Sequence, residues 1–227
     1  MIDLVVFDMA GTTVYDGDAV NASFRATLAG RGLDVDSALV NSVMGLPKPE
    51  AIRILLEQIG MPPSASLINA VHKDFTNRMC QYYAGDPAVH EIPGASATFT
   101  ALRRSGTKVA LNTGFFRPIA DVLLARLGWR SPDMIDADVT SDEVEHGRPH
   151  PDMILHLMRR LGVQDPGRVA KVGDTKADLE EGTNAGCALV IGVTTGTCSR
   201  AQLQAWPHTH ILDSVAQIPG LVSGIRH

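Results

Sequence analysis

The chain has 227 residues, of which 44% are hydrophobic and 20% charged, with a formal net charge of −5 and a pI near 5.9. This length allows a full core and a second small domain. The net negative charge argues against a protein that binds nucleic acids through a generally basic surface. Three distant cysteines without CxxC spacing, Cys80, Cys187 and Cys198, indicate reduced thiols in a cytoplasmic protein. We expect neither a signal peptide nor a membrane span, because the first residues lack a charged region and no apolar run is long enough.

The first element predicted along the chain is a buried strand over residues 3–7 that ends at Asp8. A short apolar run followed by a Gly-Thr-Thr turn indicates a strand that carries this carboxylate to its C-terminal edge, where open α/β sheets bind ligands. Such a carboxylate can attack phosphorus and form an aspartyl-phosphate. The alternative is a strand-end aspartate that makes a turn or a cap. Ala10, two residues on, cannot transfer protons, so leaving-group chemistry must come from elsewhere.

The next stretch consists of consecutive helical patterns separated by glycine and proline turns. We predict these helices near residues 18–31, 37–43, 48–60 and 65–84. They indicate a helical cap at residues 16–90, inserted after the first strand. The core would then comprise residues 1–15 and 91–227.

The remainder of the chain alternates between strands and helices. Strands are expected near 107–112, 168–172 and 188–193, and helices near 117–128, 150–161 and 176–185. This alternation predicts parallel pairing in a doubly wound, Rossmann-like α/β sheet. Asp8, Thr113 and Asp174 each end such a strand, so we expect them to meet at one edge of the sheet.

Four motifs occur in the order found in the haloacid dehalogenase superfamily. They are Asp8 with its Gly-Thr turn, Asn112-Thr113-Gly114, Gly147-Arg148-Pro149 and Gly173-Asp174-Thr175-Lys176-Ala177-Asp178. More narrowly, Asp8-Met9-Ala10-Gly11-Thr12-Thr13 resembles the phosphonatase branch, the phosphonoacetaldehyde hydrolases and their relatives. Most phosphatases of the superfamily have Asp at the position of Ala10 and Lys at that of Arg148, and phosphonatases share both departures.

The resemblance implies a nucleophile and a Mg²⁺ site at the sheet edge. Asp8 would be the nucleophile, and Asp8, the carbonyl of Ala10 and Asp174 would bind the metal directly, with Asp178 in support. Hard carboxylate oxygens suit Mg²⁺, which keeps several waters. Considered alone, Asp178 is as well explained as a helix-start residue favoured by the macrodipole.

The resemblance also implies contacts to the transferring phosphoryl group. The Thr113 hydroxyl and the Gly114 amide would donate to its oxygens, and Thr12 is placed with them as a substrate-binding residue. Arg148 would be a fixed cation near Asp8, and such cations lower the cost of developing charge in phosphoryl transfer. The alternatives are an ordinary strand-end threonine for Thr113 and a solvent-facing side chain for Arg148.

Lys48 lies in Met44-Gly45-Leu46-Pro47-Lys48-Pro49, early in the cap. In phosphonatases the matching lysine condenses with the substrate aldehyde. Direct C–P cleavage would expel an unstabilised carbanion, whereas a protonated Schiff base accepts the electrons and leaves an enamine. The lysine must be neutral to attack. The alternative for Lys48 is a solvated surface lysine. Met44 is expected to pack beside the imine, and its alternative is an ordinary core methionine.

Two departures put the natural substrate in doubt. Phosphonatases place a histidine three residues after the lysine, where this chain has Ala51, and a tyrosine after the Thr-Gly of the second motif, where it has Phe115. Proton transfer must therefore be arranged differently, and these departures favour a related 2-oxoalkylphosphonate as the substrate rather than phosphonoacetaldehyde itself. The remaining histidines His146, His150, His208 and His210 are interpreted as surface or loop residues and not as a metal site.

The sequence therefore predicts a Mg²⁺-dependent hydrolase of a small phosphonate. A phosphomonoester phosphatase is the first alternative, because a substrate with a good leaving group would need little help from an acid. A non-catalytic binding or regulatory protein on the same fold is the second. We expect no nucleic-acid or membrane partner, and the resemblance allows a homodimer through the cap.

Overall fold

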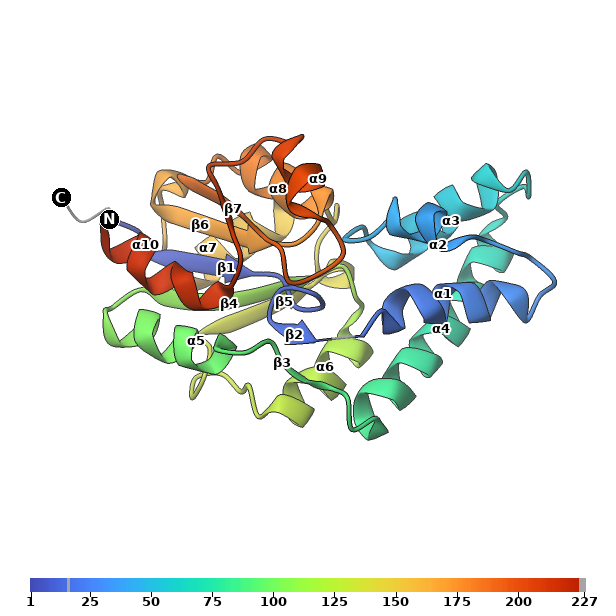
Figure 1. Cartoon of the computed structure of the whole chain (residues 1–227), viewed down its shortest axis with the longest axis horizontal. Helices are drawn as coiled ribbons and strands as arrows, with labels where there is room; N and C mark the ends of the chain where they lie inside the picture. The colour runs from blue at the N-terminus through green and yellow to red at the C-terminus, as the bar shows by residue number, and fades with distance from the viewer. Residues whose placement is uncertain (16, 225–227) are drawn as a thin grey trace.

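A computed structural model describes residues 1–15 and 17–224, and these residues contain a six-stranded parallel sheet. Its strand order is β5-β4-β1-β6-β7-β8 (Figure 1). The strands are β1 (Leu4–Phe7), β4 (Lys108–Thr113), β5 (Ala137–Thr140), β6 (Val169–Gly173), β7 (Leu189–Val193) and β8 (His210–Leu212). The expected doubly wound α/β core is confirmed.

Helices cover both faces of this sheet, which explains the nearly continuous apolar runs of its central strands. In β1, Val5 and Phe7 face one layer of helices and Leu4 and Val6 face the other. Phe7 packs edge-on against Phe99 at 5.2 Å between ring centroids. The helices of the core are α5 (Ala95–Arg104), α6 (Arg117–Leu127), α7 (Asp152–Leu161), α8 (Lys176–Asn184), α9 (Arg200–Gln204) and α10 (Ile218–Gly224).

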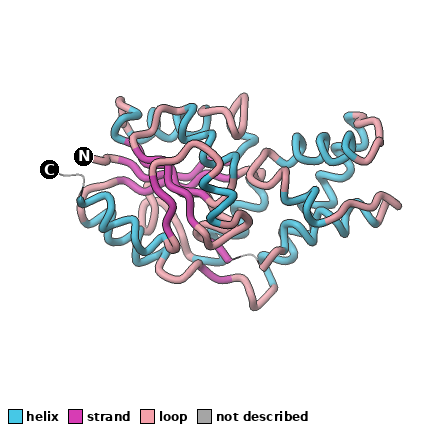
Figure 2. The backbone as a smooth tube through the Cα atoms, turned by 45° about the horizontal axis from the view of Figure 1, so that its top comes forward, coloured by secondary structure: helices cyan, strands magenta, loops and turns pink. Residues whose placement is uncertain are grey.

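A short antiparallel ribbon leads from the core to a separate group of helices. It pairs β2 (Val14–Tyr15) with β3 (His90–Glu91), and the segment proposed as the cap lies between these strands. The intervening helices are α1 (Ala19–Ala29), α2 (Ser37–Asn41), α3 (Lys48–Gln58) and α4 (Ala65–Gly85). Figure 2 shows them as a helical body beside the sheet. Within the described residues, no helix is long and apolar enough to cross a membrane.

Local sequence explains where several cap helices begin. Asp36 and Ser64 accept hydrogen bonds from the backbone N–H groups of Leu39 and Leu67, as N-cap residues commonly do. Pro49 occupies the first turn of α3, where its missing N–H costs nothing. Inside the cap, Phe24 of α1 stacks on a phenylalanine of α4 at 4.3 Å.

The sequence analysis missed several elements of the core. Strand β5 has four residues and an unremarkable Ala-Asp-Val-Thr sequence, and α5 begins with small and β-branched residues that carry little helical signal. Strand β8 begins at His210, so this histidine lies in a partly exposed edge strand and not in a loop, which agrees with its interpretation as a surface residue. Strand β8 lies at the edge of the sheet and its side chains are all partly exposed, so its sequence lacks the apolar pattern that predicts a buried strand.

Candidate active site

Neighbouring strands of the sheet bring the predicted site residues together. Asp8 follows β1, Thr113 ends β4 and Asp174 follows β6, and these strands lie side by side in the order β4-β1-β6. All three side chains are buried, with exposures of 5%, 3% and 0%. The expected meeting of these residues at one sheet edge is therefore found.

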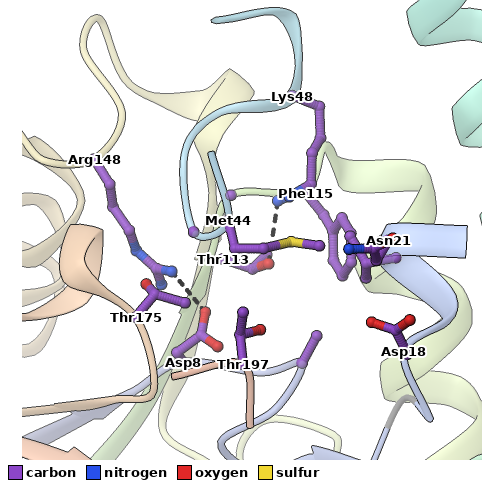
Figure 3. A pocket seen from close by; sticks show the side chains of 14 residues that line it. Asp8, Asp18, Asn21, Met44, Lys48, Thr113, Phe115, Arg148, Thr175 and Thr197 are labelled. Atoms are coloured by element: carbon purple, nitrogen blue, oxygen red, sulfur yellow. Dashed lines mark hydrogen bonds and ion pairs between the residues drawn. The ribbon is translucent and has the colours of Figure 1, made fainter. Parts of the chain in front are cut away.

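Arg148 lies against Asp8 and is not solvent-facing. Its side chain is fully buried, and Nη1 lies 2.7 Å from Asp8 Oδ1 (Figure 3). The same nitrogen lies 2.9 Å from Asp178 Oδ1. Nη2 donates to the backbone oxygen of Asn112 at 2.9 Å and to its side-chain oxygen at 2.6 Å. Burial acts to lower the pKa of Arg148, but Asp178, Asp8 and Glu181 raise it overall, so the guanidinium stays charged.

Two charged residues missed by the sequence analysis complete this network. Glu181 accepts from Arg148 Nε at 3.1 Å and from the Asn112 amide at 2.8 and 2.9 Å. Lys171 lies 3.0 Å from Glu181 and 3.1 Å from Asp178, and all of these side chains are inaccessible to solvent. A lysine in the middle of the buried run of β6 was the available signal, since an unpaired charge is rarely placed there.

Asp8, Asp174 and Asp178 offer ligand oxygens within 4.8 Å of one another. Asp174 accepts from the Thr12 hydroxyl at 2.9 Å and from the Thr197 N–H at 2.7 Å. Within the described residues it has no ion pair. Burial, together with the carboxylates of Asp8 and Asp178, raises its pKa well above the ordinary value. Such a carboxylate is stabilised by a bound cation, so this donor set fits Mg²⁺.

The acids of the cluster differ in their partners. Burial also raises the pKa of Asp8, and Arg148 opposes only part of that effect. Burial acts in the same direction on Asp178, but Arg148 and Lys171 lower its pKa overall. Thr175 donates to the second oxygen of Asp178 at 2.5 Å, in a capping box that begins α8. Asp178 thus holds the cations of the network and the start of a helix at once, which suits a supporting residue.

The other predicted residues differ in how they meet the cavity. Ala10, Met44, Gly114 and Thr113 line it together with Asp8, Lys48 and Arg148. Thr113 Oγ1 accepts from the N–H of Phe115 at 3.1 Å, which leaves its own proton to donate. Thr12 is fully buried, outside the cavity lining, and its hydroxyl is bonded to Asp174. The side chain of Thr12 therefore orients a carboxylate and does not line the cavity, so substrate binding by Thr12 remains a prediction.

Lys48 reaches the cavity from the cap and is not a solvated surface residue. It is the first residue of α3 and only 4% exposed. Its Nζ lies 4.9 Å from the ring centroid of Phe115 and 5.6 Å from that of Phe24. Desolvation by such rings disfavours a charged amine, whereas their cation–π attraction favours it.

Glycines allow the cap segment that carries Lys48 to lie directly on the core. A Cβ at Gly114 would stand 2.6 Å from the backbone oxygen of Leu46, and one at Gly147 would stand 2.3 Å from Pro47 Cγ. Gly45 has a φ of +82°, and a Cβ there would stand 2.2 Å from the hydroxyl oxygen of Thr175. The segment that carries Lys48 therefore lies directly against the core beside the site.

Comparison with known proteins places this arrangement in context. A model of the haloacid dehalogenase-like hydrolases matches residues 2–186. A phosphonoacetaldehyde hydrolase of Bacteroides fragilis is 32% identical over 239 aligned residues, covering 96% of this chain and 87% of the relative. One of Bacillus cereus is 31% identical, with coverage of 90% and 80%.

Solved structures show the same fold. A phosphonoacetaldehyde hydrolase-like protein from Oleispira antarctica has a TM-score of 0.81 and 25% identity, covering 99% of this chain and 92% of the other. A predicted phosphoglycolate phosphatase from Haemophilus somnus has a TM-score of 0.79 at 20% identity, with 97% of both chains covered. The second likeness concerns the fold alone.

Proposed function

The chain belongs to the haloacid dehalogenase-like hydrolases, and we propose that it hydrolyses the C–P bond of a 2-oxoalkylphosphonate such as phosphonoacetaldehyde. The observation that carries this proposal is a buried lysine in the same cavity as Asp8 and Arg148, at a site with Ala10 where an acid would otherwise stand. Similarity to proteins named phosphonoacetaldehyde hydrolase supports it.

The proposed reaction begins at Lys48. Its neutral amine attacks the substrate carbonyl, water leaves, and a protonated imine remains between Lys48 and the carbon skeleton. This imine lies two bonds from phosphorus and accepts the electron pair of the C–P bond as that bond breaks. The leaving group is then an enamine, which needs no acid at the position of Ala10. Closure of the cap excludes bulk water while the imine and the phosphoryl group react.

Asp8 attacks phosphorus and becomes an aspartyl-phosphate. Arg148 holds Asp8 through its 2.7 Å contact and faces the developing charge, and Thr113 can donate its hydroxyl to a phosphoryl oxygen. Mg²⁺ held by Asp8, the carbonyl of Ala10 and Asp174 would supply further neutralisation of that charge when bound. The carbon that was released from phosphorus takes a proton from solvent, which converts the enamine back into the protonated imine. Water then hydrolyses the acyl phosphate, and a second water releases Lys48 from the imine.

Borohydride trapping tests this function. The protein is incubated with phosphonoacetaldehyde and Mg²⁺, reduced with borohydride, and analysed by mass spectrometry while phosphate release is assayed. We expect an adduct on Lys48 and phosphate release, both lost in Lys48→Ala. Lys73→Ala is the matched control, since Lys73 is an exposed lysine of the cap. Phosphonate turnover unchanged in Lys48→Ala would disprove the imine.

The same experiment separates the alternatives. Phosphate released from p-nitrophenyl phosphate, without an adduct or phosphonate turnover, would indicate a phosphomonoester phosphatase that uses Asp8 and needs no acid for a good leaving group. Inactivity towards a broad panel of phosphonates and phosphate esters would favour a binding or regulatory protein.

A further inference from the structure

Asp18 departs from two local preferences at once. Its φ of 67° and ψ of 16° place it in the left-handed region, and it is the only non-glycine residue with positive φ in the described parts of the chain. It also occupies the N-cap position of α1, yet its side chain accepts no capping hydrogen bond. Aspartate at this position normally caps the helix, as Asp36 does for α2. A residue that departs from both its preferred backbone conformation and its usual capping role is characteristic of a functional position.

The side chain of Asp18 lines the cavity that holds Asp8 and Lys48. Figure 3 shows Asp18 beside Asn21, on the side of the cavity away from Arg148. Asp18 stands where the β2–β3 ribbon gives way to α1, so its left-handed backbone turns the chain at the cavity rim. The conformation therefore places a carboxylate at the cap side of the site.

Imine chemistry at Lys48 needs a group that accepts and returns protons. Ala10 and Ala51 cannot supply it. Among the described residues that line the cavity, the ionisable side chains are Asp8, Asp18, Lys48 and Arg148. Asp8 is paired with Arg148 at 2.7 Å and faces phosphorus as the nucleophile. Asp18 is the remaining carboxylate.

We propose that Asp18 is the catalytic proton carrier for formation of the imine at Lys48, an inference that rests on the proposed function. The carboxylate takes a proton from the Lys48 ammonium, and the neutral amine then forms a C–N bond to the carbonyl carbon. The carbonyl oxygen becomes the hydroxyl of a carbinolamine by gaining the proton that nitrogen loses. Asp18 then gives its proton to this hydroxyl, the C–O bond breaks, and water leaves.

The proton balance of this sequence is complete. Ammonium and carbonyl give protonated imine and water, and Asp18 ends as the carboxylate it was at the start. After the C–P bond has broken, the enamine carbon takes a proton from solvent to restore the protonated imine, and hydrolysis of that imine runs through the same steps in reverse. One carboxylate at the cavity rim, in contact with solvent, thereby serves both halves of the cycle.

Asp18→Asn tests the proposal without disturbing the backbone. Asparagine tolerates the left-handed region at least as well as aspartate, whereas alanine would be strained there. Loss of general acid–base catalysis typically costs about 10²- to 10⁴-fold, so we expect borohydride trapping at Lys48 and phosphonate turnover to slow by at least about 10². Asp34→Asn, an exposed aspartate of the cap, is the matched control and should behave as the unmodified chain does. Circular dichroism and thermal unfolding establish that each variant is folded.

The possible outcomes test the role of Asp18 separately from the proposed hydrolysis of the C–P bond. If the unmodified protein is trapped at Lys48, and Asp18→Asn is trapped more slowly and with a different pH dependence, Asp18 is supported as the proton carrier. Trapping equally fast in both proteins overturns the inference and leaves the function standing. No trapping even in the unmodified protein overturns both. If Asp18→Asn fails to fold, Asp18→Gly, which also accepts positive φ, replaces it with the same expected loss.

Discussion

Substitution of Gly114 by alanine should separate closure of the cap from folding of the core. The new Cβ would lie 2.6 Å from the backbone oxygen of Leu46 and 2.9 Å from that of Gly45. Ordinary contact begins at 3.4 Å, so the cap segment has to retreat by about 0.8 Å at this point. Since these atoms belong to the backbone, no side-chain rotation relieves the contact.

A displacement of this size moves Lys48, two residues beyond Leu46, relative to Asp8. Misplacement of reacting groups by about 1 Å can cost about 10²-fold, so we expect kcat/KM of the active substrate to fall by that factor, equivalent to about 2.7 kcal/mol. Stopped assays of phosphate release measure this loss, and limited proteolysis of the cap segment should accelerate because it closes less often.

The control for Gly114→Ala is Gly85→Ala at the end of α4, where a Cβ meets nothing within 4 Å. This variant should keep its activity and its proteolysis rate. Full activity in Gly114→Ala, with an unchanged proteolysis rate, would refute the idea that the site works only under a closely seated cap.

Two further predictions concern buried charge. Glu181→Gln leaves Arg148 and Lys171 without one of their carboxylates, so the free energy of unfolding should fall by about 3 kcal/mol in denaturant titrations. Glu180→Gln, on the same helix but partly exposed, should lose less than about 1 kcal/mol, and equal losses would contradict the network. The buried Nε2 of His72 has no hydrogen-bond partner among the described residues, and burial lowers the pKa of His72 below the ordinary 6.5. The unfolded chain then binds the proton first as pH falls, so stability should decrease from about pH 6.5 down to the pKa of the folded state, where this contribution levels off. His72→Gln should flatten that part of the stability–pH curve measured by denaturant titration, and an unchanged slope would show that another group is responsible.

The sequence alone determined the features that depend on short stretches of chain. An apolar run that ends in a carboxylate predicts a strand-end nucleophile, and alternation of strands with helices predicts a parallel sheet. Because the carboxyl ends of parallel strands share one edge of the sheet, the sequence alone places Asp8, Thr113 and Asp174 together. Family resemblance added the interpretation of Arg148 and Lys48.

Only the tertiary structure decided which partners those side chains have. Arg148, read alone, is as readily a surface residue, and its burial depends on Glu181 and Asn112, which are remote in sequence. Thr12 belongs to the right turn, but its hydroxyl faces Asp174 and not the cavity. Aspartate tolerates the left-handed backbone that Asp18 adopts, but residue type alone does not predict that conformation, since most aspartates at that position cap a helix. Burial and pairing energies are set by residues brought together through folding, and spacing along the chain does not encode that proximity.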